Sequence, residues 1–302
     1  MTRTIALAAA SLLALAACAM SKPPPPPPTA PAAALMAWPD LLERERPKES
    51  ASIAYGKNAL QVVDLWLPAG KGPHPTVLMV HGGCWQSEIA DRRIMNWIAD
   101  DLRRRGIAVW NIDYRGVDRE GGGYPGTFLD AAAAADALRQ HAAKYKLATS
   151  PLVAVGHSAG GHLALWLAGR KRLPAGSPLR TPNPMTIDHV VSLGGLPDLE
   201  KAKAEKQGCG PEVIDRLTRG SFSDTSVPHL APLGIAQSLI NGDSDRIIPT
   251  NFAYDYAAGM MGAGDPVGVA VLARTGHVEL IAPETPAWAT AVSEIKKALR
   301  RK

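Results

Sequence analysis

The stretch VAVGHSAGGHLAL, residues 153–165, places a serine between glycines directly after a short apolar run. Residues 156–160, GHSAG, fit the pattern G-x-S-x-G, which is typical of a sharp strand-to-helix turn that exposes a serine hydroxyl. Glycines permit such a turn because larger side chains would collide with neighbouring backbone. The pattern therefore predicts that Ser158 is a nucleophile rather than an incidental residue of a glycine turn.

A nucleophilic serine needs a general base, and the base is in turn oriented by an acid. After this kind of turn, the chain order is serine, acid, histidine. His277, in ARTGHVELI, lies in a glycine-marked loop after the last predicted strand, so we expect it to be the base. The other candidates are set aside because they adjoin the serine in sequence or have structural explanations: His157, His162, His189 and His229.

The acid is expected in NGDSDRIIP, residues 241–249, which follows the preceding predicted strand. Asn241 and Gly242 form the turn, so Asp245 lies in the loop beyond it, and we favour Asp245 as the acid. Asp243 is the alternative, although an aspartate at its place commonly caps a turn. The predicted catalytic residues are thus Ser158, Asp245 and His277.

Hydrolysis of an acyl group also needs donors for the developing oxyanion. The segment HGGCW, residues 81–85, directly follows the predicted strand TVLMV and has glycines that leave backbone N–H groups free. We assign the oxyanion hole to the amides of Gly83 and Ala159, with Cys84 as a further candidate; each donor can lower the barrier by about 2.7–4 kcal/mol. Trp85 and Tyr114 are candidates for the substrate pocket, and a place in the core explains them equally well.

Around these residues, short apolar runs alternate with helical patterns. Strands are predicted at 52–56, 60–68, 76–80, 107–112, 152–155, 190–194, 236–240 and 267–273. Helices are predicted at about 91–105, at 126–145, directly after Ser158, at 251–261 and at 286–300. This alternation predicts an α/β fold with a doubly wound, mostly parallel sheet of about eight strands and helices on both faces. The alternation of predicted strands and helices is interrupted between about 196 and 232, where we expect a small lid-like insertion or an ordinary crossover with extra turns.

Composition agrees with an ordinary globular α/β protein. Of 302 residues, 46% are hydrophobic and 20% charged, and the net charge of +5 is spread along the chain. The tightest basic group, Arg103–Arg105, falls where a predicted helix ends and complements its dipole. The charges therefore give no reason to expect a nucleic-acid partner. The sequence carries no indication of oligomeric state.

The first 37 residues are predicted to direct the export of the protein and to tether it to a membrane. Arg3 is followed by an apolar run from Ile5 to Ala17, which suits a signal peptide and is too short for a spanning helix. The run ends in LAAC, which resembles a bacterial lipobox and implies a lipid on Cys18, with a plain secretory peptide as the alternative. Six prolines follow and favour an extended spacer. We therefore expect a signal peptide at 1–17, an acylated cysteine and tether at 18–37, and a catalytic domain at 38–302. The protein would then be exported and anchored by its lipid in the cell envelope, on the outer membrane if the cell is Gram-negative.

Two cysteines remain if Cys18 carries a lipid. Cys84 and Cys209 could form a disulfide in an oxidising compartment, or both could be free and buried. Sequence alone does not place their Cα atoms within bonding range.

The stretches HGGCW, GHSAGGHLALW, NGDSDRIIP and GHVELI, taken together, resemble the α/β-hydrolase superfamily over most of residues 52–300. Within it the chain is most similar to the esterase and kynurenine-formamidase-like group, which includes BD-FAE-like proteins. The resemblance implies a Ser-His-Asp triad that hydrolyses carboxylic esters or N-formyl amides of small molecules, without a cofactor or metal. Cys84 departs from the pattern, since formamidases tend to have an aromatic residue there.

The expected function is therefore a carboxylesterase-like serine hydrolase acting through an acyl-enzyme, because an exported enzyme fits an ester outside the cytosol. The alternatives are an arylformamidase-type amide hydrolase, a serine peptidase on the same fold, and a non-catalytic binding lipoprotein of the envelope. The last would be expected to lack a triad residue, and none is lacking here.

Overall fold

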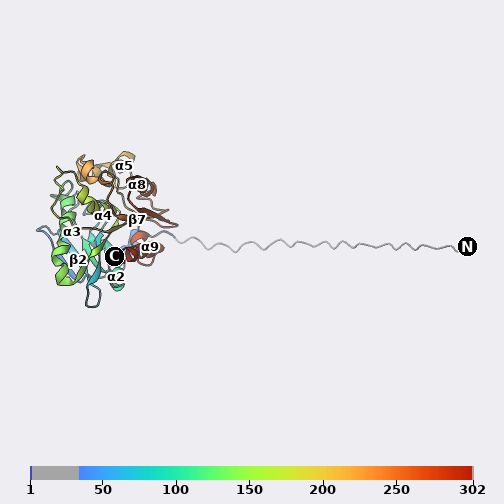
Figure 1. Cartoon of the computed structure of the whole chain (residues 1–302), viewed down its shortest axis with the longest axis horizontal. Coiled ribbons are helices and arrows are strands. Elements are labelled where there is room, and N and C mark those ends of the chain that lie inside the picture. Colours follow the sequence, from blue (N-terminus) through green and yellow to red (C-terminus); the bar gives the residue numbers. More distant parts are fainter. Residues whose placement is uncertain (2–33, 301–302) are drawn as a thin grey trace. The chain divides into compact units, whose positions relative to one another are not determined.

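The computed structural model describes residue 1 and residues 34–300 (Figure 1). One compact unit runs from Leu35 to Lys302, and residues 1–34 are a separate unit. The predicted signal peptide, Cys18 and most of the predicted tether fall within residues 2–33, outside the described residues, so the lipid anchor stays a prediction. None of the described helices is long and apolar enough to cross a membrane.

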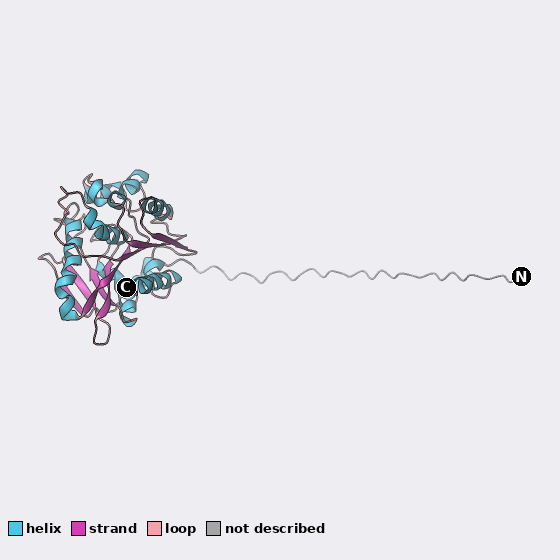
Figure 2. Cartoon of the chain, in the orientation of Figure 1, coloured by secondary structure: helices cyan, strands magenta, loops and turns pink. Residues whose placement is uncertain are grey.

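The strands described within residues 34–300 form one eight-stranded sheet in the order β1-β2-β4-β3-β5-β6-β7-β8 (Figure 2). β2 pairs antiparallel with β1 and β4, and every other neighbouring pair is parallel. The sequence-based prediction of a mostly parallel sheet is confirmed. The strands are β1 (Ala51–Ala54), β2 (Val62–Trp66), β3 (His74–Val80), β4 (Ala108–Ile112), β5 (Leu147–His157), β6 (His189–Leu193), β7 (Ala236–Gly242) and β8 (Val267–Leu272).

Helices cover both faces of this sheet, as predicted (Figures 1 and 2). The α-helices are α1 (Trp38–Leu42), α2 (Asn96–Arg104), α3 (Gly126–Tyr145), α4 (Ala159–Gly169), α5 (Leu199–Glu205), α6 (Pro211–Thr218), α7 (Phe222–Thr225), α8 (Asn251–Gly262) and α9 (Pro286–Leu299). Short 3₁₀ helices occur at η1 (Arg92–Met95), η2 (Arg170–Arg172), η3 (Val227–Leu230) and η4 (Glu279–Ile281).

Two hydrophobic layers flank the sheet. On one face, α1, α2 and α9 pack against the strands in a cluster that includes Leu41, Ile98 and Trp288, all fully buried. On the other face, α3, α4 and α8 form a second cluster, and the insertion packs on it through α5 and α6. Leu199 of α5 and Ile214 of α6 are completely buried. The insertion is therefore a packed part of the body between β6 and β7.

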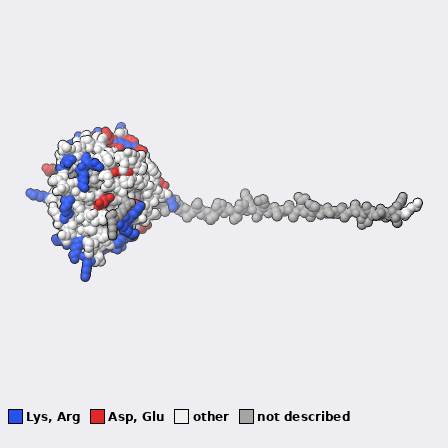
Figure 3. Space-filling view, viewed as in Figure 1, with Lys and Arg blue, Asp and Glu red and all other residues white. Residues whose placement is uncertain are grey.

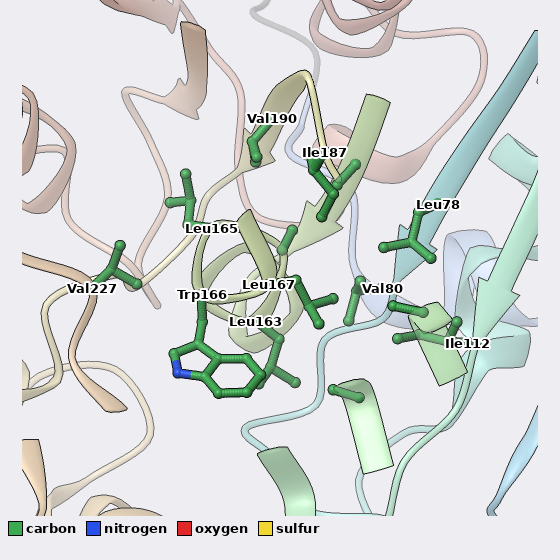
Figure 4. Close-up of a cluster of buried hydrophobic side chains, with 14 of the residues drawn as sticks. Leu78, Val80, Ile112, Leu163, Leu165, Trp166, Leu167, Ile187, Val190 and Val227 are labelled. Atoms are coloured by element: carbon green, nitrogen blue, oxygen red, sulfur yellow. The ribbon is translucent and has the colours of Figure 1, made fainter. Parts of the chain in front are cut away.

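Helix α4 is buried along most of its length because its sequence, AGGHLALWLAG, is apolar on all sides. Leu163, Leu165 and Trp166 contact the layer formed by Leu78 of β3 and Val190 of β6 (Figure 4). Burial of a side chain of this size stabilises a fold by about 1.5–3 kcal/mol. The start of α4, at the carboxyl end of β5, is thereby held in one place, and that is where Ser158 lies.

Basic and acidic side chains are interspersed on the face of the compact unit that Figure 3 shows. The predicted helix-end cluster is paired internally, since Arg103 and Arg104 bridge Asp100 and Arg105 bridges Asp101.

Candidate active site

Ser158 occupies a sharp turn between β5 and α4, with φ of 54° and ψ of −123°. A positive φ is uncommon for a residue other than glycine and costs of order 1–3 kcal/mol, so surrounding structure must hold it. Gly156 and Gly160 make the turn possible: a Cβ on Gly156 would lie 2.0 Å from the carbonyl oxygen of Gly160, and one on Gly160 would lie 2.2 Å from that of Val80. The strand–turn–helix context predicted from G-x-S-x-G is present.

The cavity at this turn has a volume of about 180 Å³, and both Ser158 and His277 line it. Ser158 is only 3% exposed and His277 only 7%. No hydrogen bond joins the serine hydroxyl to another of the described residues; catalytic hydrogen bonds are often looser before substrate binds. The two side chains therefore share one small chamber at the carboxyl ends of the parallel strands, which is where α/β sheets bind ligands.

A larger groove of about 740 Å³ lies at the opposite, amino ends of the strands. Its walls include Lys171, Arg172 and Ile187. None of the predicted catalytic residues lines it. Size alone therefore does not identify the site, and the chemistry points to the smaller cavity.

His277 is oriented by Asp245. The imidazole Nδ1 lies 2.6 Å from Asp245 Oδ2, and both side chains are buried. Asp245 is held in turn by its Oδ1, which accepts the backbone N–H groups of Ile247 and Ile248 at 2.8 and 2.9 Å. A proton on Nδ1 that is donated to the carboxylate leaves Nε2 as the basic nitrogen. The alternative acid, Asp243, is exposed and instead accepts the hydroxyl of Ser244.

His157 supports the backbone of the same loop. Its Nε2 lies 3.1 Å from the carbonyl oxygen of His277, and the two ring centroids are 4.4 Å apart. Burial lowers the pKa of the His157 imidazole well below its usual range, and the neighbouring His277 ring lowers it further. The neutral ring can donate one hydrogen bond, and the geometry assigns it to the His277 carbonyl. Sequence reasoning set His157 aside as a base and did not foresee this supporting contact.

The candidate oxyanion donors come from the HGGCW loop and from the start of α4. Gly83, Cys84 and Trp85 all have positive φ, of 105°, 51° and 52°. Gly83 and Cys84 line the cavity, and Ala159 is the first residue of α4, where helix N–H groups lack intrahelical acceptors. The backbone N–H groups of Gly83, Cys84 and Ala159 find no acceptor among residues 34–300. Donors in this state are available to an oxyanion.

Trp85 and Tyr114, the two candidate pocket residues, belong to the core instead. Trp85 is fully buried, with its ring edge-on to that of His162 at 5.4 Å. Tyr114 is stacked on His81 at 4.3 Å and donates its hydroxyl to the His81 carbonyl at 3.0 Å. Neither lines the cavity. Of the two interpretations that the sequence left open, pocket and core, the structure favours the core for both side chains.

A disulfide joins Cys84 to Cys209, with Cα atoms 5.3 Å apart. The sequence left this pairing open. Cys209 lies between α5 and α6, so the bond fastens the loop of candidate oxyanion donors to the insertion. The insertion expected to resemble a lid is thus covalently attached to one wall of the cavity.

Trp38 and Leu42 of α1 also line the cavity. Sequence reasoning missed both and placed the start of the domain at Trp38 without assigning it a role. The only signal available was an isolated tryptophan after a proline-rich stretch, which does not specify which part of the fold it contacts. Within residues 34–300, no group of three or more His, Cys, Asp or Glu side chains is placed to hold a metal ion.

A family model described as BD-FAE matches residues 63–224, more than half of the chain. The chain belongs to the BD-FAE family. No curated protein sequence matches it. The matched region contains the HGGCW loop and Ser158, whereas Trp38, Asp245 and His277 lie outside it.

Solved esterase structures are similar to this chain over most of its length. A truncated carbohydrate esterase from gut microbiota is 20% identical with a TM-score of 0.68, covering 85% of this chain and 99% of its own. A thermophilic esterase from Thermogutta terrifontis is 19% identical with a TM-score of 0.68, covering 84% and 92%. Esterase B from Lactobacillus rhamnosis is 18% identical with a TM-score of 0.69, covering 84% and 87%. This BD-FAE chain therefore has the α/β-hydrolase fold, and the findings support a hydrolase of the esterase type.

Proposed function

We propose that this protein is a serine hydrolase that cleaves carboxylic esters of small molecules through an acyl-enzyme. The observation that carries the proposal is the 2.6 Å pairing of His277 with Asp245 at a cavity that Ser158 also lines. Unengaged backbone N–H groups on the facing wall supply what acyl transfer further requires.

In the first half of the proposed reaction, Ser158 Oγ attacks the carbonyl carbon of the ester as its proton passes to His277 Nε2. Asp245 keeps the imidazole in the tautomer with Nδ1 protonated and stabilises the imidazolium that forms. The carbonyl oxygen becomes an oxyanion and accepts hydrogen bonds from the amides of Gly83, Cys84 and Ala159. When the intermediate collapses, the alcohol leaves with the proton from His277, and the acyl group stays on Ser158.

In the second half, a water molecule attacks the acyl carbon and gives one proton to His277. The carboxylic acid then leaves, and Ser158 regains its proton from the imidazole. Among the similar structures, esterase 2 of Thermogutta terrifontis has been solved with propionate bound and phosphonylated by sarin. A carboxylic acid in one and a phosphonyl group in the other are what a serine esterase would take up, which supports the same chemistry here.

The substitution Ser158→Ala tests the proposal. We expect kcat/KM for p-nitrophenyl acetate to fall by about 10³-fold or more, because the nucleophile is lost while the fold is retained. Labelling by a fluorophosphonate probe should disappear as well. Ser293→Ala is the matched control, since Ser293 is an exposed serine on α9 remote from the cavity. Retained turnover or retained labelling in Ser158→Ala would show that another residue is the nucleophile.

A further inference from the structure

The outer wall of the cavity comes from a part of the chain that precedes the first strand. Trp38 and Leu42 of α1 line the cavity together with Ser158 and His277. The centroid of the Trp38 ring lies 6.3 Å from that of His277 and 6.3 Å from that of His157, with interplanar angles of 77° and 73°. The indole therefore contacts the rings beside the nucleophile directly.

This N-terminal segment is fixed to the body of the protein. The backbone N–H of Met36 donates to Glu279 Oε1 at 2.6 Å, and Leu41 is completely buried beside α2 and α9. Farther along, Arg44 forms a salt bridge with Glu284. Trp38 lies between these attachments and is itself half-buried. The wall is therefore part of the folded unit and holds a defined position over the cavity.

The remaining walls are aliphatic. Ile89, Ile94 and Ile247 line the cavity with Leu42, and no Asp, Glu, Lys or Arg side chain is among the lining residues described. The cavity has a volume of about 180 Å³. Pockets for drug-sized ligands span roughly 300–1,000 Å³. An ester bound at Ser158 can therefore place only a short apolar group in this cavity.

We propose that Trp38 is a specificity-determining residue that closes the cavity against long chains, so that the enzyme prefers esters with a short apolar group. The inference rests on the proposed serine esterase function. The indole is the largest side chain in the wall, and Leu42 beside it is partly open to solvent at 40% exposure. Removing the ring would widen the opening of the cavity to the surface and lengthen the space available beyond Ser158.

Two substrate series test this with the full chain. The first varies the acyl group of p-nitrophenyl esters from two to eight carbons, and the second varies the alcohol of acetate esters over the same range. In Trp38→Ala we expect the ratio of kcat/KM for the longest to the shortest substrate to rise about tenfold or more in one series, since a single methylene is worth about tenfold in a hydrophobic pocket. Trp38→Phe should give a smaller rise. The exposed aromatic of α8 supplies the control, and Tyr254→Ala should keep the wild-type ratio.

The series in which the ratio changes identifies the group, acyl or alcohol, that occupies the cavity. Unchanged ratios in both series would overturn the proposal. A loss of activity that is equal for all substrates would also overturn it, because it would show that Trp38 only supports the His277 ring. Absence of both turnover and fluorophosphonate labelling in the wild-type protein would instead reject the esterase function on which the inference rests.

Discussion

The two walls of the cavity are held in different ways. On the donor side, Gly83, Cys84 and Trp85 have positive φ, the Trp85 side chain is buried, and a disulfide fixes Cys84 to Cys209. On the base side, His277 has no covalent attachment beyond its own backbone and is held by hydrogen bonds. The donor side thus has an unusual backbone conformation that a disulfide fixes, whereas the base side has a histidine that only hydrogen bonds hold in place.

Glu279 is central to the base side. Its carboxylate accepts the N–H of Gly276, next to His277, at 3.1 Å and that of Met36, just before Trp38, at 2.6 Å. Glu279 is only 7% exposed, so these two bonds replace most of the hydration that the carboxylate would have in water. The loop that carries His277 and the segment that leads into α1 are thus positioned by one buried side chain.

The difference matches the work that each wall would do. Backbone donors stabilise an oxyanion only if they already point at it, since any reorganisation during the reaction reduces their effect. An imidazole that accepts and returns a proton needs its tautomer and orientation set, which hydrogen bonds through Nδ1 achieve. The comparison predicts that breaking the disulfide will damage the donor side and that substitutions of hydrogen-bonding side chains will damage the base side.

The largest effect is expected from breaking the disulfide with Cys209→Ser, which leaves Cys84 and its backbone unchanged in sequence. We expect kcat to fall by about tenfold or more with KM little changed, because oxyanion donors act chiefly in the transition state; removing one donor outright costs about 10²–10³-fold. Stability should also fall, by about 2–5 kcal/mol for a native disulfide.

Assays of Cys209→Ser belong at a temperature well below its unfolding midpoint, with the wild-type protein measured before and after reduction and reoxidation. Recovery of kcat on reoxidation would tie the loss to the bond itself. An unchanged kcat in the folded, reduced protein would show that the disulfide stabilises the fold without positioning the donors.

A smaller effect is expected from Glu279→Gln. The glutamine offers one acceptor and one NH₂ group, so it cannot accept from both Gly276 and Met36, and one buried N–H loses its partner. We expect the free energy of unfolding to fall by about 1–3 kcal/mol, measured by urea denaturation. Glu284→Gln is the matched control: it removes a partly exposed salt bridge to Arg44, which is typically worth about 0–1 kcal/mol. Equal losses in the two variants would contradict the special position of Glu279.

Three features were predictable from sequence because each depends on local residues. They are the HGGCW loop, the strand-to-helix turn at Ser158 and the order of the proposed triad residues. Gly156 and Gly160 flank the serine in five residues, and the strand before them is a plain apolar run. Asp245 was preferred to Asp243 on turn geometry, on the known order of triad residues and on the resemblance to the α/β-hydrolase superfamily, and the structure places Asp245 against His277. The strands were found at nearly their observed positions for the same reason.

Features that depend on distant contacts were not predictable. β5 begins at Leu147 rather than Leu152 because its first residues pair with His74 and Pro75 of β3. No local apolar pattern in the sequence indicates this pairing. The five residues of α1 give too short a pattern to reveal that Trp38 reaches the cavity. Likewise, Trp85 and Tyr114 have the amphipathic character of pocket residues, and only packing decides that they lie beneath the loop.

The most gradual of the expected effects is the loss of stability in mild acid. Burial lowers the pKa of His162 to about 4, and that of His157 falls well below 6.5. Between pH 6.5 and about 4, the unfolded chain therefore binds protons that the folded protein does not, so stability is lost as the pH falls. The expected slope is about 1.4 kcal/mol per pH unit for each histidine.

Urea denaturation at successive pH values measures this slope. His162→Gln should lower stability at pH 7.5 and flatten the dependence below pH 6.5, since it removes one of the two buried imidazoles. The disulfide does not titrate, so the acid-dependent loss should be the same in oxidised and reduced protein. A pH-independent stability between 6.5 and 5 would contradict the assignment of both rings as neutral and buried.

The hydrogen bond from Met36 to Glu279 spans 243 positions of the sequence. Ribosomes make the N-terminal partner first, so the N–H of Met36 has no acceptor on Glu279 until nearly all of the folded unit has been synthesised. A polypeptide that ends before residue 277 lacks both the imidazole proposed as the general base and the carboxylate of Glu279 that accepts the N–H of Met36. The proposed activity should therefore appear in a single step, at the end of synthesis, and not grow gradually with chain length.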